Sequence, residues 1–153
     1  MTTAARCTTV IDELRSGQRG AIAITGQVEF ILYVADQEVA TTFWGVVLGQ
    51  APSLDVPGMT EFTLPEGAIL GLMPEAGVVA LLGAALPDPA GARGVPRAEV
   101  YLVVDDPAAC HARALAAGAV ELSPLAERNW GDMVAYCLDP DGHVLAFASR
   151  RAP

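Results

Sequence analysis

The sequence contains no lysine, and its nine basic residues, all arginine, face 18 acidic ones, so the formal net charge is −9. An acidic chain without a basic stripe argues against nucleic acid as a partner, because proteins bind phosphate backbones with clustered cationic side chains. The charge suits a neutral or cationic small ligand, although ordinary surface charge that keeps a protein in solution explains it equally well.

Long apolar runs are also missing. No run reaches the roughly 20 residues that a membrane-spanning helix needs. The first apolar stretch is short and is not preceded by the positively charged region that begins a secretory signal. We therefore expect a soluble, cytoplasmic protein that does not use a membrane as a partner. Cysteine is scarce too: Cys7, Cys110 and Cys137 are odd in number and lack metal-ligand spacing, which predicts buried, reduced thiols.

What the sequence does contain is an eight-residue motif that occurs twice. Residues 29–36 read EFILYVAD and residues 99–106 read EVYLVVDD, and each is a run of strand-forming residues that ends in aspartate. A second motif also occurs twice: residues 66–73 read EGAILGLM and residues 141–148 read DGHVLAFA. In a chain of 153 residues with 52% hydrophobic content, the simplest interpretation is two half-domains built on one plan.

The first half begins with a strand over residues 29–34. Alternation places Glu29, Ile31 and Tyr33 on one of its faces, and an all-apolar set on the other, which should meet a helix. That helix is predicted over residues 36–48, with Asp36 as its N-cap and Gly49 at its end. Further strands are predicted at residues 61–64, 69–73 and 78–82.

The second half repeats this order after a linker over residues 86–97, which holds three prolines and two glycines. A strand is predicted over residues 99–104, and a helix from Asp106 and Pro107 to Gly118. The last strands are predicted near residues 120–122, 133–138 and 144–148. Residues 1–27 have no counterpart in the second half and form an N-terminal extension, with a possible short helix over residues 10–16 and a strand over residues 21–25.

These features resemble the vicinal oxygen chelate superfamily, the group of glyoxalases, bleomycin-resistance proteins and extradiol dioxygenases. The resemblance covers residues 28–148. It is carried by the strand ends at residues 34–36 and 104–106 (VAD and VDD), by the helix residues 43–44, 48–49 and 116–118 (FW, LG and AAG), and most specifically by residues 130–131 and 136–143 (WG and YCLDPDGH).

The resemblance implies an α+β fold in which two βαβββ modules form a curved mixed sheet around a cleft, the glyoxalase/bleomycin-resistance fold. The modules are residues 28–85 and 98–148, joined by the linker 86–97. It also implies a homodimer, with modules that pair either within one chain or between two.

Metal-dependent members carry His or Glu ligands at the start of the first strand and late in the last strand of each module. By resemblance these positions fall on Glu29, Gly71, Glu99 and Ala146. Gly71 and Ala146 cannot supply a ligand, and two carboxylates alone make a poor divalent site. We therefore expect no cofactor, with a divalent metal held by Glu29, Glu99 and water as the alternative.

The two histidines do not change this prediction. We expect His111 at the surface of the second helix and His143 in the turn before the last strand. Asp139 and Asp141 belong to the same turn and are assigned no chemistry.

The strand faces that carry the two glutamates would instead line a pocket with aromatic walls. Trp130 is the strongest contact candidate, because a large aromatic residue in a polar loop is poorly explained by core packing. Trp44, on a helix, is expected in the core or at a dimer interface. The ordinary alternatives are solvent exposure for the glutamates and core packing for the tyrosines. The predicted ligand-binding residues are Glu29, Tyr33, Met73, Glu99, Tyr101 and Trp130.

Such a lining favours a planar or cationic organic molecule. The sequence therefore predicts a binding protein of the antibiotic-resistance type, which sequesters a small aromatic or cationic molecule without a metal and is not an enzyme. One alternative is a metal-dependent lyase, isomerase or dioxygenase of the superfamily. Another is a metal-free enzyme or an interaction module that kept only the fold.

Overall fold

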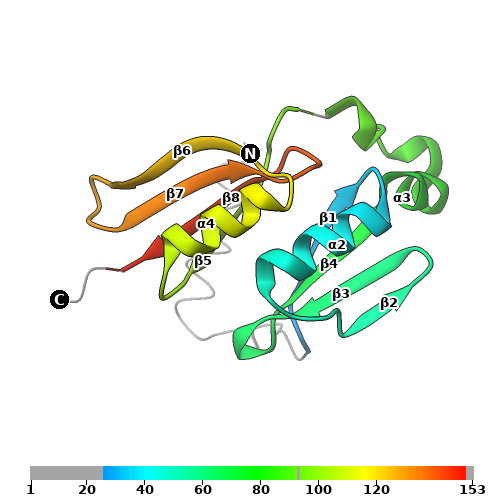
Figure 1. Cartoon of the computed structure of the whole chain (residues 1–153). Coiled ribbons are helices and arrows are strands. Elements are labelled where there is room, and N and C mark those ends of the chain that lie inside the picture. Colours follow the sequence, from blue (N-terminus) through cyan, green and yellow to red (C-terminus); the bar gives the residue numbers. More distant parts are fainter. Residues whose placement is uncertain (1–25, 93, 151–153) are drawn as a thin grey trace, which may run out of the picture.

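A computed structural model describes residues 26–92 and 94–150 of the chain (Figure 1). The first half contains β1 (Glu29–Val34), α2 (Gln37–Leu48), β2 (Leu54–Val56), β3 (Met59–Thr63) and β4 (Ile69–Pro74). Next comes α3 (Glu75–Leu82) and a connection with short 3-10 turns. The second half contains β5 (Glu99–Val103), α4 (Pro107–Ala116), β6 (Val120–Glu127), β7 (Met133–Leu138) and β8 (Val144–Ser149). The predicted α+β fold of two βαβββ modules is thereby confirmed.

The strands form two four-stranded mixed sheets of identical topology. Their orders are β1-β4-β3-β2 and β5-β8-β7-β6, and only the first and last strands of each module, β1 with β4 and β5 with β8, pair in parallel. Ile31 pairs with Gly71 in the first sheet and Tyr101 with Ala146 in the second. The register of the two sheets therefore reproduces the repeat seen in the sequence.

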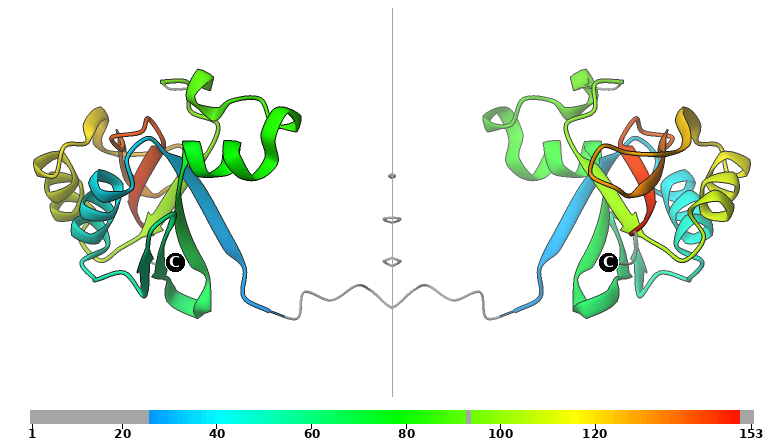
Figure 2. Two further views of the ribbon diagram at one scale, coloured as in Figure 1. Left: turned by 90° about the vertical axis from the view of Figure 1, so that its right-hand side faces the viewer. Right: turned by 90° about the vertical axis from the view of Figure 1, so that its left-hand side faces the viewer.

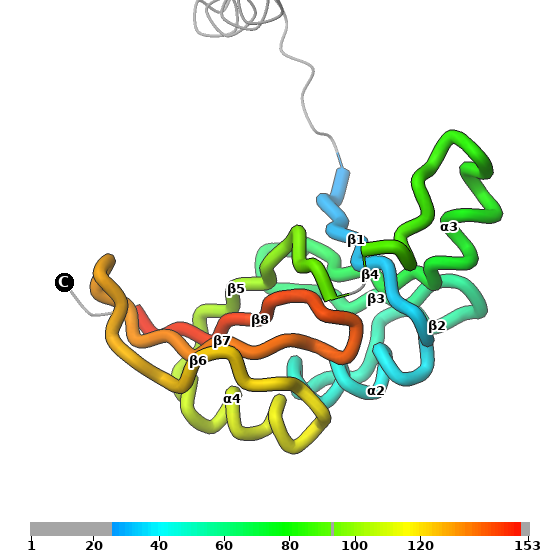
Figure 3. The backbone as a smooth tube through the Cα atoms, turned by 90° about the horizontal axis from the view of Figure 1, so that it is seen from above, coloured from blue at the N-terminus to red at the C-terminus, as the bar shows by residue number. Residues whose placement is uncertain are grey.

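The two long helices cover the same side of the sheets. α2 and α4 lie next to each other on that side, as the side views and the view from above show (Figures 2 and 3). Arg113 of α4 donates from Nη2 to the backbone oxygen of Val47 in α2, at 3.0 Å. One hydrophobic core extends under both helices, with Phe43, Trp44 and Phe62 from the first module and Leu145 and Phe147 from the second. The two modules are thus joined through a shared core.

The helix boundaries follow the predicted capping signals. The Asp36 side chain accepts from the backbone N–H of Val39 at 3.0 Å, and Gly49 ends α2 in the left-handed conformation at φ 66°. Asp106 caps α4 in the same way, through the N–H of Ala109 at 2.9 Å. Trp44 is fully buried in the core, against Phe43 in an edge-to-face arrangement.

Two elements of the first module differ from the prediction. Residues 78–82, predicted as a strand, belong to α3, because a short apolar run fits a helix as well as a strand. The strand β2 was missed. It pairs with β3 across a two-residue turn in which Pro57 is followed by Gly58 at φ 95°, a turn signal that was present in the sequence.

Two predictions for the second module also need correction. The strand predicted over residues 120–122 extends through β6 to Glu127, despite Pro124, with irregular register against β7. His111, expected at the surface, is only 7% exposed, because it shares one stripe of α4 with the buried Pro107 and Ala114.

The thiols fit the prediction in part. Cys137 is buried, and its burial, helped by the charge of Asp139, raises its pKa to about 11. Cys110 is half-buried, and Cys7 lies outside the described residues, as do the helix and strand predicted within residues 1–25. None of the helices that the structure describes combines the length and apolarity that a membrane crossing requires.

Candidate functional site

The site is built on the sheet faces that α2 and α4 leave uncovered, which we call the open faces. In β1, Leu32 and Val34 are buried, whereas Ile31 and Tyr33, which share a face with Glu29, are exposed. In β5, Glu99, Tyr101 and Val103 are exposed in the same alternating way. The predicted alternation is thus confirmed, and both glutamates stand on an open face, one on each sheet.

On the first sheet, Glu29 lies flat against its neighbouring strand. A Cβ atom placed on Gly71 would stand 2.5 Å from Oε1 of Glu29. The carboxylate therefore fills the space that a side chain at position 71 would need. Met73, two residues further along β4, is half-buried and reaches toward α3, where its Cε lies 3.6 Å from the Cβ position of Gly77.

On the second sheet, Tyr101, Trp130 and Asp132 are joined by hydrogen bonds. The Tyr101 hydroxyl donates to Oδ2 of Asp132 at 2.8 Å and accepts from the Trp130 side chain. Burial, followed by the hydrogen bond and charge of Asp132, raises the pKa of Tyr101, against a lowering effect of Trp130. Trp130 remains 56% exposed. The loop thus presents a fixed but accessible indole beside a carboxylate.

A second aromatic residue, Tyr136 of β7, lies in the same row of the sheet. Ala146 pairs with Tyr101 on one side and with Tyr136 on the other, so its small side chain separates two tyrosines. Burial and then the charge of Glu99 raise the pKa of Tyr136, which places this glutamate within electrostatic reach of the ring, while Arg128 lowers it.

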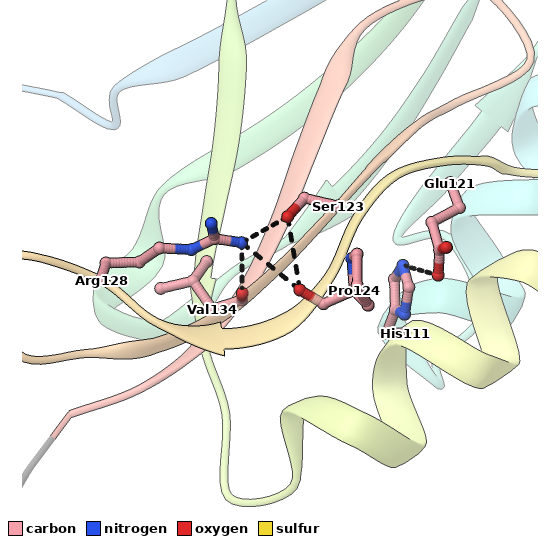
Figure 4. A network of polar contacts seen from close by, with 6 residues as sticks. All are labelled: His111, Glu121, Ser123, Pro124, Arg128 and Val134. Atoms are coloured by element: carbon pink, nitrogen blue, oxygen red, sulfur yellow. Dashed lines mark hydrogen bonds and ion pairs between the residues drawn. The ribbon is translucent and has the colours of Figure 1, made fainter.

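Arg128 supports this row from the edge of the sheet (Figure 4). Its guanidinium lies 5.0 Å from the centre of the Tyr136 ring. Its Nη2 donates to Oγ of Ser123 at 2.8 Å and to the backbone oxygen of Val134 at 2.9 Å. These bonds hold β6 against β7 where the strand pairing is irregular. They also keep the guanidinium over the Tyr136 ring, in a cation–π contact.

The structure thus brings together three of the six predicted residues, Glu99, Tyr101 and Trp130, on the second sheet. Glu29 and Met73 lie on the first sheet. Tyr33 lines a separate hollow at the junction of the modules, which neither glutamate lines. Sequence reasoning missed Asp132, Tyr136 and Arg128.

Tyr136 could have been found. Side chains alternate between the two sheet faces along β7, and the repeat indicates how β8 lies beside it. Together these place the Tyr136 side chain on the same sheet face as Tyr101. Asp132 and Arg128 depend on the shape of the β6–β7 loop, for which the sequence carries only the positive-φ signal of Gly131.

The described residues do not fit the divalent metal that some members of the vicinal oxygen chelate superfamily carry. No group of three His, Cys, Asp or Glu side chains converges within the part of the chain that the structure describes. At the four family positions, Glu29 covers Gly71, and Ala146 offers only a methyl group between two tyrosine rings. The described residues at these positions therefore supply too few donors for a transition-metal centre.

Comparison with known proteins agrees with the architecture. The sequence model of the Glyoxalase/Bleomycin resistance protein/Dioxygenase superfamily matches residues 26–147. No protein with a curated description matches the chain.

Solved structures with this fold come from several bacteria. A glyoxalase-related enzyme from Fulvimarina pelagi is 24% identical over 83% of this chain and 89% of its own, with a TM-score of 0.70. A glyoxalase/bleomycin resistance protein/dioxygenase from Nocardioides is 21% identical over 92% and 93%, with a TM-score of 0.69. A family enzyme from Burkholderia phytofirmans is 17% identical over 80% and 97%, also at 0.69. These likenesses support the fold, and the family match covers most of the chain: it belongs to the glyoxalase/bleomycin resistance protein/dioxygenase superfamily.

Proposed function

We propose that this chain is a binding protein that holds a small aromatic or cationic organic molecule on its open faces, without a metal, as antibiotic-sequestering proteins do. The observation that carries the proposal is the exposed Trp130, tethered to Tyr101 and flanked by Asp132. A large exposed indole that is held in place by a hydrogen bond offers a rigid stacking surface at low entropic cost.

The chemistry around Trp130 favours a cation. Tyr101 adds a second ring, and Glu99 and Asp132 add two carboxylates, so a planar cation gains stacking, cation–π attraction and charge pairing at once. Each cation–π contact is worth about 0.5–2 kcal/mol, depending on how far the pair is removed from water. Arg128 already lies on the ring of Tyr136, which leaves the faces of Trp130 and Tyr101 for the ligand.

The first sheet completes the proposed site. Glu29 and Met73 would contact the part of the ligand that extends beyond the second sheet, or a ligand shared with a second copy of the chain, whereas Tyr33 lines the separate hollow at the junction of the modules. The open face of the first sheet exposes Leu54, Val56 and Ile31, an apolar surface that suits a homodimer. We place the protein in the cytoplasm, with no nucleic acid or membrane as partner.

Tryptophan fluorescence tests the proposal, because the chain has two tryptophans and only Trp130 is exposed. A panel of planar cationic antibiotics should quench it saturably, and Trp130→Phe should abolish the quenching. Glu99→Gln should weaken binding by about tenfold, the effect of one lost charge-assisted contact. Glu121→Gln is the matched control, since it removes the same charge beside His111 and away from this cluster.

Two results would overturn the proposal. One is the absence of any saturable response across the panel, and the other is equal weakening by Glu99→Gln and Glu121→Gln. A stoichiometric metal in protein purified without chelator, lost on substitution of Glu29 and Glu99, would instead favour the metal-dependent lyase, isomerase or dioxygenase.

A further inference from the structure

A hollow of about 470 Å³, which we call the junction hollow, lies where the two modules meet, and none of the residues of the Trp130 cluster lines it. Its walls come from the end of β1, the start of α3, the linker between the modules and the turn between β7 and β8 (Figure 1). Small-molecule sites have volumes of roughly 300–1,000 Å³ and often form between domains. The hollow is therefore large enough for a small organic molecule.

The linker forms an apolar wall of this hollow. Proline restricts the backbone of the linker there, because its ring fixes φ, and a wall with little freedom loses little entropy when a ligand binds. The strand β1 adds Ile31 and Tyr33 to the lining. The apolar linker residues are Leu86, Pro87, Pro89, Val95 and Pro96.

The acidic and imidazole groups of the hollow already have partners within the protein. Oδ1 of Asp141 accepts from the backbone N–H of Ala35 at 2.7 Å, and Nδ1 of His143 is hydrogen-bonded to Oδ2 of Asp139 at 2.9 Å. Glu75, at the start of α3, is only 8% exposed and also has an interaction partner. The protein itself thus stabilises these groups, and none of them requires a charged ligand.

The charges in the lining have both signs. Arg97 lines the hollow together with Asp141 and Glu75, and its side chain is exposed to solvent. An ammonium or a carboxylate group would therefore meet one unlike and one like charge, and it would lose its own hydration on entry. A hydroxyl group avoids this cost, because it is neutral and both donates and accepts hydrogen bonds.

We propose that the junction hollow is a second binding site, independent of the Trp130 cluster, for a small neutral molecule with a hydrocarbon body and a hydroxyl end. The hydrocarbon body lies against the apolar wall of the linker and against Ile31, and the hydroxyl group lies on the polar side of the hollow. Both modules and the linker line the site, so the ligand stabilises their packed arrangement.

Hexan-1-ol is the probe for this site, because it has neither a charge nor a ring that could stack on Trp130. Ring signals of Tyr33 and His143 in proton NMR report on two walls of the hollow, β1 and the turn. Tyr33→Phe and His143→Gln assign these signals. We expect both to shift saturably with one common dissociation constant, in the millimolar range for so small a ligand. The signal of His111, buried in α4, and the fluorescence of Trp130 should not change.

Chain length and head group test the chemistry of the ligand. Butan-1-ol should bind about tenfold more weakly than hexan-1-ol, because it buries two methylene groups fewer. Hexylamine and hexanoate have the same chain length and are charged at neutral pH. Each should bind about tenfold more weakly than hexan-1-ol, because its head group must give up water without gaining an unopposed partner.

Two matched variants test the place of binding. Ala92 is an exposed residue of the lining, so Ala92→Phe adds a ring at the hollow and should weaken hexan-1-ol binding at least about tenfold. Ala84→Phe makes the same change at an exposed residue that does not line the hollow, and it should leave binding unaltered. Both positions are on the surface, where substitutions rarely impair folding.

Several results would overturn the proposal. They are the absence of a saturable shift at Tyr33 or His143, different dissociation constants at the two, equal binding of the two alcohols, tighter binding of hexylamine or hexanoate than of hexan-1-ol, and equal effects of Ala92→Phe and Ala84→Phe. None of these results bears on the planar cations proposed for the Trp130 cluster.

Discussion

The carboxylate of Glu29 rests on the bare backbone of Gly71, on the strand beside it. The equivalent residues of the second module are Glu99 and Ala146, and there the Ala146 methyl group is packed against Tyr136. Glu99 acts on the Tyr136 ring through its charge. The same strand pattern thus places its glutamate in two different environments. The neighbouring strand carries glycine at position 71 in the first module and alanine at position 146 in the second.

Gly71→Ala should reveal this contact. The new Cβ would stand 2.5 Å from Oε1 of Glu29, so the carboxylate must swing away, at a cost of about 0.5–1 kcal/mol of coupling between the two positions. In a Glu29→Ala background the same change should cost less, because the clash with the carboxylate is gone and only the approach to Ile31, at 3.1 Å, remains. Urea unfolding of the four proteins of this double-mutant cycle measures the difference.

The control for this cycle is Gly77→Ala in α3. Its Cβ would meet only Cε of Met73, at an ordinary 3.6 Å. It should stabilise the protein by up to about 1 kcal/mol through helix propensity, equally with and without Glu29. The tight approach of Ile31 to position 71, at 3.1 Å, is common to both backgrounds and cancels in the cycle. Identical costs of Gly71→Ala in both backgrounds would contradict the contact.

Arg128→Met should weaken the second sheet and change the ionisation of Tyr136. The variant loses the Nη2 bonds to Ser123 and Val134, which predicts a loss of about 1–3 kcal/mol in the free energy of unfolding. It also removes the charge of Arg128, which lowers the pKa of Tyr136, so burial and Glu99 should then raise this pKa further. Absorbance at alkaline pH follows the three tyrosines of the chain.

The control is Arg150→Met, which removes the same charge from an exposed residue after β8. We expect less than about 0.5 kcal/mol of change, as for most surface substitutions, and an unaltered tyrosine titration. If Arg128→Met leaves the titration unaltered as well, the guanidinium does not act on the Tyr136 ring.

Local signals in the sequence predicted much of the fold. Asp36 and Gly49 bounded α2 because capping depends on neighbouring backbone groups. The repeat made Gly71 and Ala146 equivalent positions, and the structure pairs them with the equivalent residues Ile31 and Tyr101.

The errors arose where local signals compete. The apolar run in α3 has no strong period, so its sequence does not distinguish a helix from a strand. His111 looked like a polar surface residue, although its spacing from Pro107 and Ala114 matched a buried helix stripe.

The site was less predictable than the fold. Alternation correctly put Tyr101 on an open face, but its bond to Asp132 depends on how the loop after β6 closes, through the N–H of Arg128 to the oxygen of Asp132 at 2.8 Å. The junction hollow depends on how the linker packs over β1, which a proline-rich sequence does not specify.

His143 should make stability depend on pH near neutrality. Burial lowers its pKa, but the hydrogen bond and charge of Asp139, with Asp141 and Glu75, outweigh burial and raise it above the ordinary 6.5. A basic group whose pKa is higher in the folded state stabilises that state fully below its unfolded pKa, and this contribution disappears as the pH rises through the folded value. The free energy of unfolding, from urea titrations in half-unit steps from pH 5.5 upward, should therefore fall above about pH 6.5. His143→Gln should remove this fall, whereas His111→Gln, at the buried histidine of α4, should keep it even if the protein is less stable throughout. A fall that survives His143→Gln would show that the Asp139–His143 pair does not produce it.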